Sequence, residues 1–157
     1  KVLLNLMPTA TSSDIIELSS EKKTEELAIK FLKKLKIGDV VFLYGEMGVG
    51  KTTFVKYLIN GLQKENELRL TEVTSPTFNL LNEYQINQKK INHYDLFRLK
   101  SFEELKSLDL FNDSASSITV IEWPQIIKEK PNNLIELTFK YKDDHKKRYA
   151  EIKGLNL

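Results

Sequence analysis

The spacing of apolar and polar positions divides the first half of the chain into strands and helices. The apolar run Val40–Tyr44 has the composition of a strand buried on both faces. Apolar positions then recur with the helical period over residues 52–62, which predicts an amphipathic helix directly after a glycine-rich turn. A second amphipathic helix is predicted over residues 21–36, with Ser19 or Ser20 as its N-cap. Strand, turn and helix therefore follow one another in the order of a β–α unit.

Shorter apolar runs predict further elements. Residues 15–18 have the pattern of an edge strand, and residues 79–84 and 91–95 indicate two strands joined by a hairpin turn at 86–90. The segment 101–108 begins with a serine followed three residues later by a glutamate, which is typical of a short capped helix. Strands and helices thus continue through the middle of the chain.

The last third of the chain is rich in strands. Residues 118–121 form a second strongly apolar strand that ends in Glu122, and Pro124 terminates it. Residues 134–141 and 148–153 alternate with a period of two, as expected of a half-exposed antiparallel pair. We therefore predict an α/β fold with a mainly parallel central sheet, flanking helices and an antiparallel C-terminal hairpin.

Length and composition suit one globular domain. The 157 residues are 41% hydrophobic and 29% charged, and they include no cysteine that could form disulfides or thiolate metal sites. We expect a loose N-terminal segment with the edge strand over residues 1–20 and a single domain over 21–157. No apolar run is long enough to span a bilayer, so we expect a cytoplasmic protein without a membrane partner. The net charge of +2 is too small to indicate DNA binding.

The glycine-rich turn matches the phosphate-binding loop, in which two glycines with four residues between them precede a lysine and a serine or threonine. Its residues are Gly45, Glu46, Met47, Gly48, Val49, Gly50, Lys51 and Thr52. Glycines let backbone N–H groups converge on an anion, and the following helix adds the positive end of its dipole. Lys51 can reach the β- and γ-phosphates, and the Thr52 hydroxyl can bind magnesium. The fold is therefore predicted to be of the P-loop NTPase type.

Two acidic residues are candidates for the magnesium site. Asp95 and Glu122 each end a predicted strand, where a phosphate-loop enzyme needs a carboxylate for the metal or its water. The strand before Glu122 is the more apolar, which favours Glu122 slightly, and either residue could instead be a carboxylate without a role at the sheet rim.

Three more residues near these motifs have competing interpretations. Thr77, in the Ser-Pro-Thr-Phe stretch, belongs either to a switch segment near the γ-phosphate or to an ordinary loop before a strand. His93 is interpreted as a structural hydrogen-bonding residue rather than a catalytic base, because no serine or cysteine partner stands out. Arg98 could stabilise phosphate charge, although a surface ion pair is the simpler role.

These features favour an ATP-binding phosphate-loop enzyme. The Asn-Lys-x-Asp motif of guanine-specific relatives does not occur, so ATP is preferred as substrate. The expected reaction is phosphoryl transfer to water with magnesium as cofactor. A small-molecule kinase and a binding module gated by ATP are the alternatives.

Four stretches in this order resemble the TsaE family. They are Gly45–Phe54, Ser75–Phe78, His93–Leu99 and Val120–Pro124. The resemblance implies an ATPase of bacterial tRNA threonylcarbamoyladenosine synthesis, whose hydrolysis of ATP resets a complex of the TsaD and TsaB proteins. Transfer chemistry and tRNA would belong to those partners, so this chain would meet tRNA indirectly. We expect slow hydrolysis without partners, since no arginine finger is evident apart from Arg98.

The resemblance also implies roles for individual residues. Gly45 to Thr53 would bind the phosphates, Asp95 would be the Walker B-like aspartate and Glu122 the glutamate at the metal. Thr24, in the first helix, would lie beside the base. The family's basic residue after the last strand aligns near Lys146, with Arg148 close by.

Overall fold

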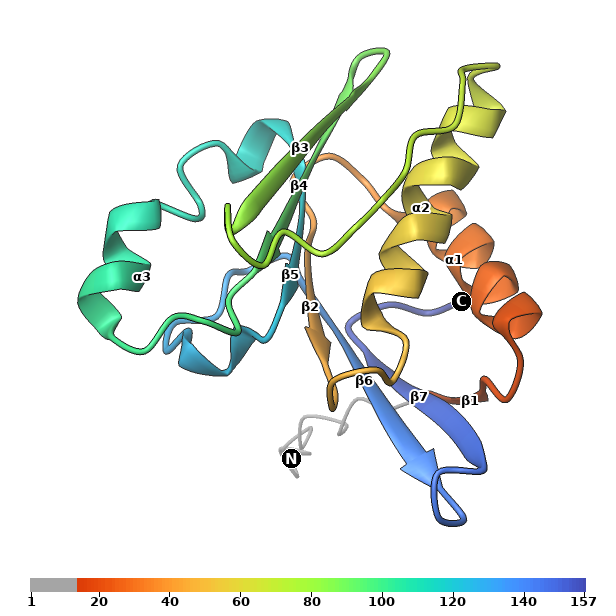
Figure 1. The fold of residues 1–157 in the computed structure, drawn as a ribbon. Helices are drawn as coiled ribbons and strands as arrows, with labels where there is room; N and C mark the ends of the chain where they lie inside the picture. The colour runs from red at the N-terminus through yellow and green to blue at the C-terminus, as the bar shows by residue number, and fades with distance from the viewer. Residues whose placement is uncertain (1–13) are drawn as a thin grey trace, which may run out of the picture.

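The computed structural model describes residues 14–157 and contains one seven-stranded sheet in the order β1-β7-β6-β2-β5-β4-β3 (Figure 1). The predicted looseness of the first residues falls on 1–13, outside the described part. The strands are β1 Asp14–Glu17, β2 Val40–Tyr44, β3 Leu81–Ile86, β4 Lys89–Asp95, β5 Ile118–Glu122, β6 Leu134–Lys142 and β7 Lys147–Lys153.

The centre of the sheet is parallel and its margins are antiparallel. β2 pairs in parallel with β5 and with β6, and β4 pairs in parallel with β5. The β3–β4 hairpin closes one margin, while β6, β7 and β1 form antiparallel pairs at the other. The predicted α/β fold, with a mainly parallel centre and an antiparallel C-terminal hairpin, is confirmed.

Helices cover both faces of this sheet (Figure 1). The helices α1 Glu21–Lys34 and α2 Lys51–Glu65 pack on one face, and the short helix α3 Phe102–Leu108 lies on the other. On the first face, Phe31 and Phe54 meet edge to face at 5.1 Å, and both side chains are fully buried. No helix within residues 14–157 is long and apolar enough to cross a membrane.

Element boundaries differ from the predictions where local signals compete with packing. α1 begins after its N-cap Ser20 as predicted, but ends at Lys34 because Leu35 is extended, with a ψ of 136°. α2 continues to Glu65, and its residue Gln63 is buried and holds Thr71 through two side-chain hydrogen bonds. The first predicted strand of the hairpin begins later than expected, because Leu80 adopts a left-handed conformation after a turn.

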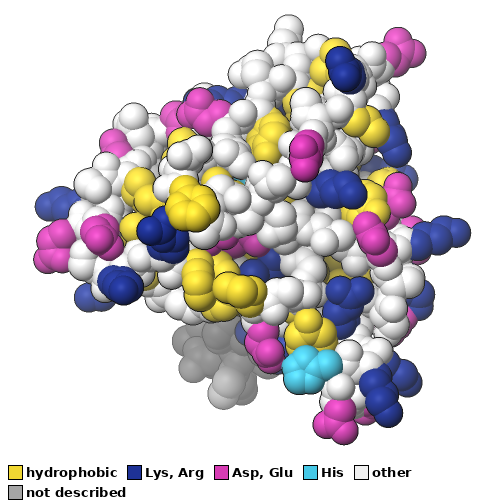
Figure 2. All heavy atoms as spheres, viewed as in Figure 1, with side chains coloured by type: hydrophobic (Ala, Val, Ile, Leu, Met, Phe, Trp, Pro, Cys, Tyr) yellow, Lys and Arg dark blue, Asp and Glu magenta, His cyan; other side chains and the backbone are white. Residues whose placement is uncertain are grey.

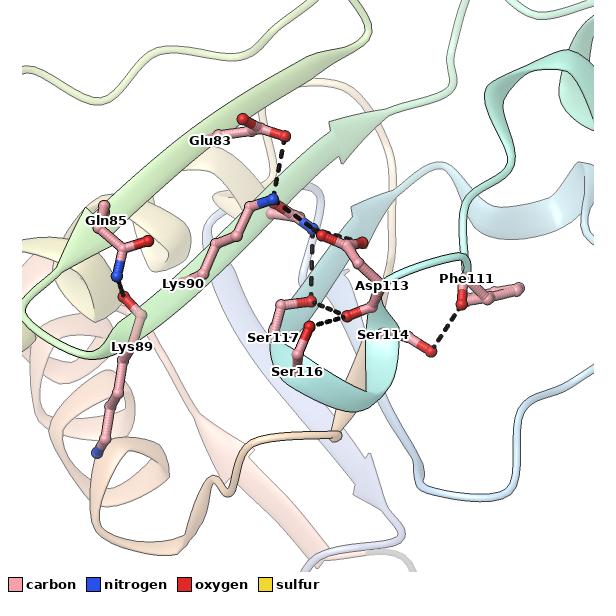
Figure 3. A network of polar contacts seen from close by, with 10 residues as sticks. Glu83, Gln85, Lys89, Lys90, Phe111, Asp113, Ser114, Ser116 and Ser117 are labelled. Carbon is pink, nitrogen blue, oxygen red and sulfur yellow. Dashed lines mark hydrogen bonds and ion pairs between the residues drawn. The ribbon is translucent and has the colours of Figure 1, made fainter.

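A polar network ties the β3–β4 hairpin to the loop before β5 (Figure 3). The Lys90 ammonium lies 2.9 Å from the Asp113 carboxylate and 3.4 Å from that of Glu83. The Asn92 amide donates to Asp113, and the Ser117 hydroxyl donates to the Asp113 carbonyl. This pairing lowers the pKa of the Asp113 carboxyl, chiefly through the hydrogen bond from Lys90. The network fixes β4 and β5 at the end of the sheet opposite the phosphate loop.

Candidate functional site

The phosphate loop leaves the carboxyl end of β2 through glycines that no other residue replaces easily. Gly45 has a φ of +142°, and a Cβ built there would lie 2.8 Å from both the Phe139 carbonyl oxygen and the Val49 side chain. Gly50 is the N-cap of α2 in a left-handed conformation, and it has no side chain to cap the first N–H groups of the helix. The loop therefore presents backbone donors at the lower edge of the sheet in Figure 1.

Lys51 is buried at the start of α2, with 4% of its surface exposed. Its ammonium donates to the Gly45 carbonyl and, at 3.1 Å, to the Glu46 carbonyl, and it lies 3.9 Å from the centroid of the Trp123 ring. Burial lowers the pKa of this ammonium, and the carboxylates of Glu122, Asp95 and Glu46 oppose the shift. The lysine is thus held beside the loop, and a phosphate group could replace the two carbonyls as acceptors.

Glu122 and Thr52 meet although they lie 70 residues apart. The Thr52 hydroxyl donates to the Glu122 carboxylate at 3.0 and 3.3 Å, which joins the first turn of α2 to the end of β5. The other side of the carboxylate contacts Nε2 of His93 at 2.6 Å. Glu122 and His93 are 2% and 0% exposed. A hydroxyl and a carboxylate oxygen therefore sit side by side at the loop, as a magnesium ion would require.

Asp95 ends β4 beside Glu122, its register partner on β5. Its carboxylate accepts hydrogen bonds from the Ser75 hydroxyl and, at 3.0 Å, from the Phe97 backbone N–H. Thr77 follows in a turn, and its backbone N–H donates to the Ser75 carbonyl at 2.9 Å. The Ser-Pro-Thr segment is therefore attached to the acidic end of β4.

The β6–β7 hairpin supports the phosphate loop from the other side (Figure 1). The Arg148 guanidinium donates to the Val49 carbonyl at 3.4 Å. At the hairpin tip, the His145 ring packs against Tyr141 with centroids 4.3 Å apart, and it lies 3.7 Å from the Glu46 carboxylate. Cationic and aromatic side chains thus flank the loop on the side away from the two acids.

These groups surround one pocket of about 340 Å³. The residues lining it are Met47, Gly48, Gly50, Lys51, Thr52, Thr53, Ser75, Thr77, Asp95, Phe97, Glu122, Trp123 and Arg148. Its rim carries exposed apolar side chains, since Met47 is 68% and Phe97 48% exposed. Figure 2 shows hydrophobic side chains gathered in patches on this face, with charged side chains spread around them.

The structure brings most of the predicted site residues into this pocket, although Gly45, Glu46 and Val49 of the loop are not part of its lining, and it places three further residues elsewhere. Thr24 is buried in α1 and does not line the pocket. Lys146 lies exposed at the hairpin tip, also outside the lining. Arg98 packs its guanidinium 4.9 Å from the Phe78 ring and forms no ion pair within the described residues.

Sequence reasoning gave no individual role to Ser75 or Trp123 and placed Arg148 second to Lys146. The alternation along β7 indicates Arg148, because it has the same parity as the buried Ala150 and Ile152 and therefore points inward. The position of Trp123 depends on a left-handed backbone, with a φ of 58°, that no local pattern predicts. Ser75 could have been found from its position before a proline, which holds it extended.

The donor set fits magnesium bound together with a phosphate ligand. Residues 14–157 contain no cluster of three or more histidine, cysteine, aspartate or glutamate side chains that could hold a metal ion. A phosphate-loop magnesium ion needs only one or two protein oxygens, with phosphate and water oxygens completing its shell. The adjacent Thr52 hydroxyl and Glu122 carboxylate meet that requirement.

The fold and the loop define a protein of the phosphate-loop class. Comparison with known sequences gives the particular family. The profile described as "Threonylcarbamoyl adenosine biosynthesis protein TsaE" matches residues 18–150. The chain belongs to this family, which is involved in threonylcarbamoyladenosine synthesis on tRNA.

Individual relatives agree with this assignment. A TsaE protein of Rickettsia bellii is 43% identical over 83% of this chain and 88% of its own length. TsaE of Aquifex aeolicus is 35% identical over 83% of this chain and 90% of its own. The crystal structure of Bacillus subtilis YdiB shares the fold, with a TM-score of 0.70 over 91% of this chain and 86% of that chain at 22% identity.

Proposed function

We propose that this protein is a magnesium-dependent ATPase required for threonylcarbamoyladenosine modification of tRNA, and that its hydrolysis of ATP resets a complex of TsaD and TsaB. The observation that carries the proposal is the contact between Thr52 and Glu122, which places two oxygen ligands for magnesium beside the phosphate loop. The family assignment supports the pathway, since the relatives are called tRNA threonylcarbamoyladenosine biosynthesis proteins.

The side chains divide the work of phosphoryl transfer to water. Lys51 would leave the carbonyls of Gly45 and Glu46 and bind the β- and γ-phosphates. Thr52 and Glu122 would hold magnesium, which neutralises developing charge on the phosphates when bound. Asp95 and Thr77 line the same pocket and would orient the attacking water and the switch segment. Catalysis would then rest on positioning and electrostatics.

Partner dependence is supported by what surrounds the pocket. Arg98 lies over Phe78 rather than in the pocket, so it does not serve as an arginine finger in this conformation. The exposed Met47 and Phe97 at the rim are apolar surface that a protein partner could cover. We therefore expect slow turnover by the isolated chain and faster turnover with TsaD and TsaB.

The test is ATP hydrolysis by the protein alone, with the TsaD–TsaB pair, and with the pair plus tRNA. Stimulation by the pair that disappears in Lys51→Ala would support the proposal. Glu122→Gln separates hydrolysis from binding, because it keeps the shape of the side chain and removes its charge. Modification that persists in Glu122→Gln without hydrolysis would indicate a binding module gated by ATP. Unchanged turnover with and without the pair would contradict the proposed role.

A further inference from the structure

We propose that His93 is a positioning residue, which holds the Glu122 carboxylate in the orientation needed at the magnesium site. The inference rests on the proposed function, because Glu122 matters there as a metal ligand. His93 lies on β4, two strands from β2 and its phosphate loop, and outside the pocket, so it does not touch the nucleotide.

The two side chains lie on neighbouring parallel strands. His93 is opposite Val120 in the register, and Asp95 is opposite Glu122, so His93 and Glu122 are diagonal neighbours on the face that α2 covers. His93 Nε2 and Glu122 Oε2 are 2.6 Å apart, and both side chains are excluded from solvent. A separation this short between a nitrogen and a carboxylate oxygen requires a proton on the line between them.

The surroundings of the ring select one tautomer. Nδ1 of His93 is buried without a hydrogen-bond partner among the described residues. A proton on Nδ1 would leave a buried donor unsatisfied and would set the Nε2 lone pair against the carboxylate. A proton on Nε2, with Nδ1 as the unprotonated nitrogen, avoids both penalties. His93 therefore donates to Glu122, and its ring orientation is fixed by the sheet.

The carboxylate of Glu122 is consequently held from two directions. His93 binds Oε2 from the sheet side, and the Thr52 hydroxyl donates to Oε1 at 3.0 Å from the α2 side. Magnesium would take over the contact with Thr52, which leaves His93 as the remaining hydrogen-bond donor to the carboxylate. Partners that orient a metal ligand in this way typically change metal affinity by about 10–100-fold when removed.

The test compares two substitutions of the same residue. His93→Gln can still donate from its amide nitrogen to Glu122, whereas His93→Phe keeps the ring shape and removes the donor. Asn92→Leu is the matched control, because Asn92 is the neighbouring buried polar residue on β4 and contacts Asp113 on the opposite face. Trp123 is the only tryptophan in the chain and lines the pocket, so its fluorescence can report ADP binding.

ADP is titrated with and without magnesium for each protein. We expect the strengthening of ADP binding by magnesium to fall by about tenfold or more in His93→Phe. It should be largely retained in His93→Gln and unchanged in Asn92→Leu, while binding without magnesium stays similar in all folded variants. A magnesium effect in His93→Phe equal to that of the original protein would overturn the positioning role alone. If magnesium does not change the ADP affinity of the original protein, that result would overturn the proposed function as well.

Nitrogen NMR supplies a readout that is independent of binding. The chain has two histidines, so the His93 ring can be assigned from the signal lost in His93→Gln. We expect a proton on Nε2, directed at the Glu122 carboxylate. A ring without a proton on Nε2 would overturn the proposed hydrogen bond.

Discussion

The ammonium nitrogen of Lys51 lies 3.9 Å from the centroid of the Trp123 ring, and that ring in turn packs against Phe97 with centroids 4.8 Å apart and planes tilted by 49°. An ammonium over an indole face gains about 0.5–2 kcal/mol, with the larger values at desolvated sites. The indole therefore helps to hold the ammonium beside the phosphate loop before any nucleotide arrives.

Removing the indole should weaken nucleotide binding. We expect Trp123→Leu to lower ATP affinity by about 2–30-fold, the equivalent of the contact's 0.5–2 kcal/mol. The ATP affinity of Trp123→Phe should lie between those of the native protein and Trp123→Leu, because a phenyl ring attracts a cation less strongly than an indole. Isothermal titration calorimetry measures all three affinities, and equal affinities for the Leu and Phe variants would argue against a role for the ring.

Lys51 should make the folding stability vary with pH in the alkaline range. Its pKa is lowered by burial, so between that lowered value and the ordinary 10.5 the unfolded chain binds more protons than the native state. Stability must therefore rise with pH across this window, as the cost of burying the charge disappears. Urea unfolding of the native protein and of Lys51→Met can be measured at several alkaline pH values. The free energy of unfolding of the native protein should rise with pH relative to that of the variant. A constant difference would contradict the assigned shift.

Two glycines of the phosphate loop should differ in their tolerance of a methyl group. Gly48 has a φ of +82°, and a Cβ there would meet only the Tyr141 hydroxyl at 3.9 Å. Gly48→Ala should therefore cost the left-handed penalty of about 1–2 kcal/mol, or roughly 2–8 °C in Tm. Gly45→Ala adds a collision with the Phe139 carbonyl and should lower Tm further. Thermal unfolding of both variants gives the two Tm losses. A larger Tm loss for Gly48→Ala than for Gly45→Ala would contradict this prediction.

The Asp113 network should stabilise the fold at neutral pH, and its contribution to stability should decrease in acid. Because its folded pKa lies below the ordinary 3.8, Asp113 contributes stability that is fully present above 3.8 and lost as pH falls toward the lowered value. Asp113→Asn should reduce stability at pH 7, and its difference from the native protein should shrink through that acid window. Glu83→Gln is the control, since Glu83 lies farther from Lys90 and should change stability little. A pH-independent deficit would point to lost packing instead.

Local patterns were enough to predict the framework of the site. The apolar run at Val40–Tyr44 indicated a strand buried on both faces, and such a strand lies in the middle of a sheet, where β2 is found. Asp95 and Glu122 both follow apolar strands, and the carboxyl ends of parallel neighbours meet at one edge. The predicted acids therefore lie together beside the loop.

The remaining parts depend on contacts between distant segments. No local pattern shows that β6 would pair with β2, and this pairing brings the hairpin and Arg148 against the loop. The bond between His93 and Glu122 depends on the register of β4 against β5, in which a shift of one residue would reverse the faces. The left-handed turn at Trp123 costs backbone energy that only the surrounding packing can offset.

The strand order also gives the pocket a polarity. The carboxylates of Asp95 and Glu122 come from strands on one side of β2, and the guanidinium of Arg148 comes from the hairpin on the other side. This separation of charge is fixed by the topology of the chain, and surface substitutions cannot invert it. A ligand whose two ends differ in charge would therefore experience opposite forces at its ends and adopt one orientation, even before any hydrogen bond with the protein forms.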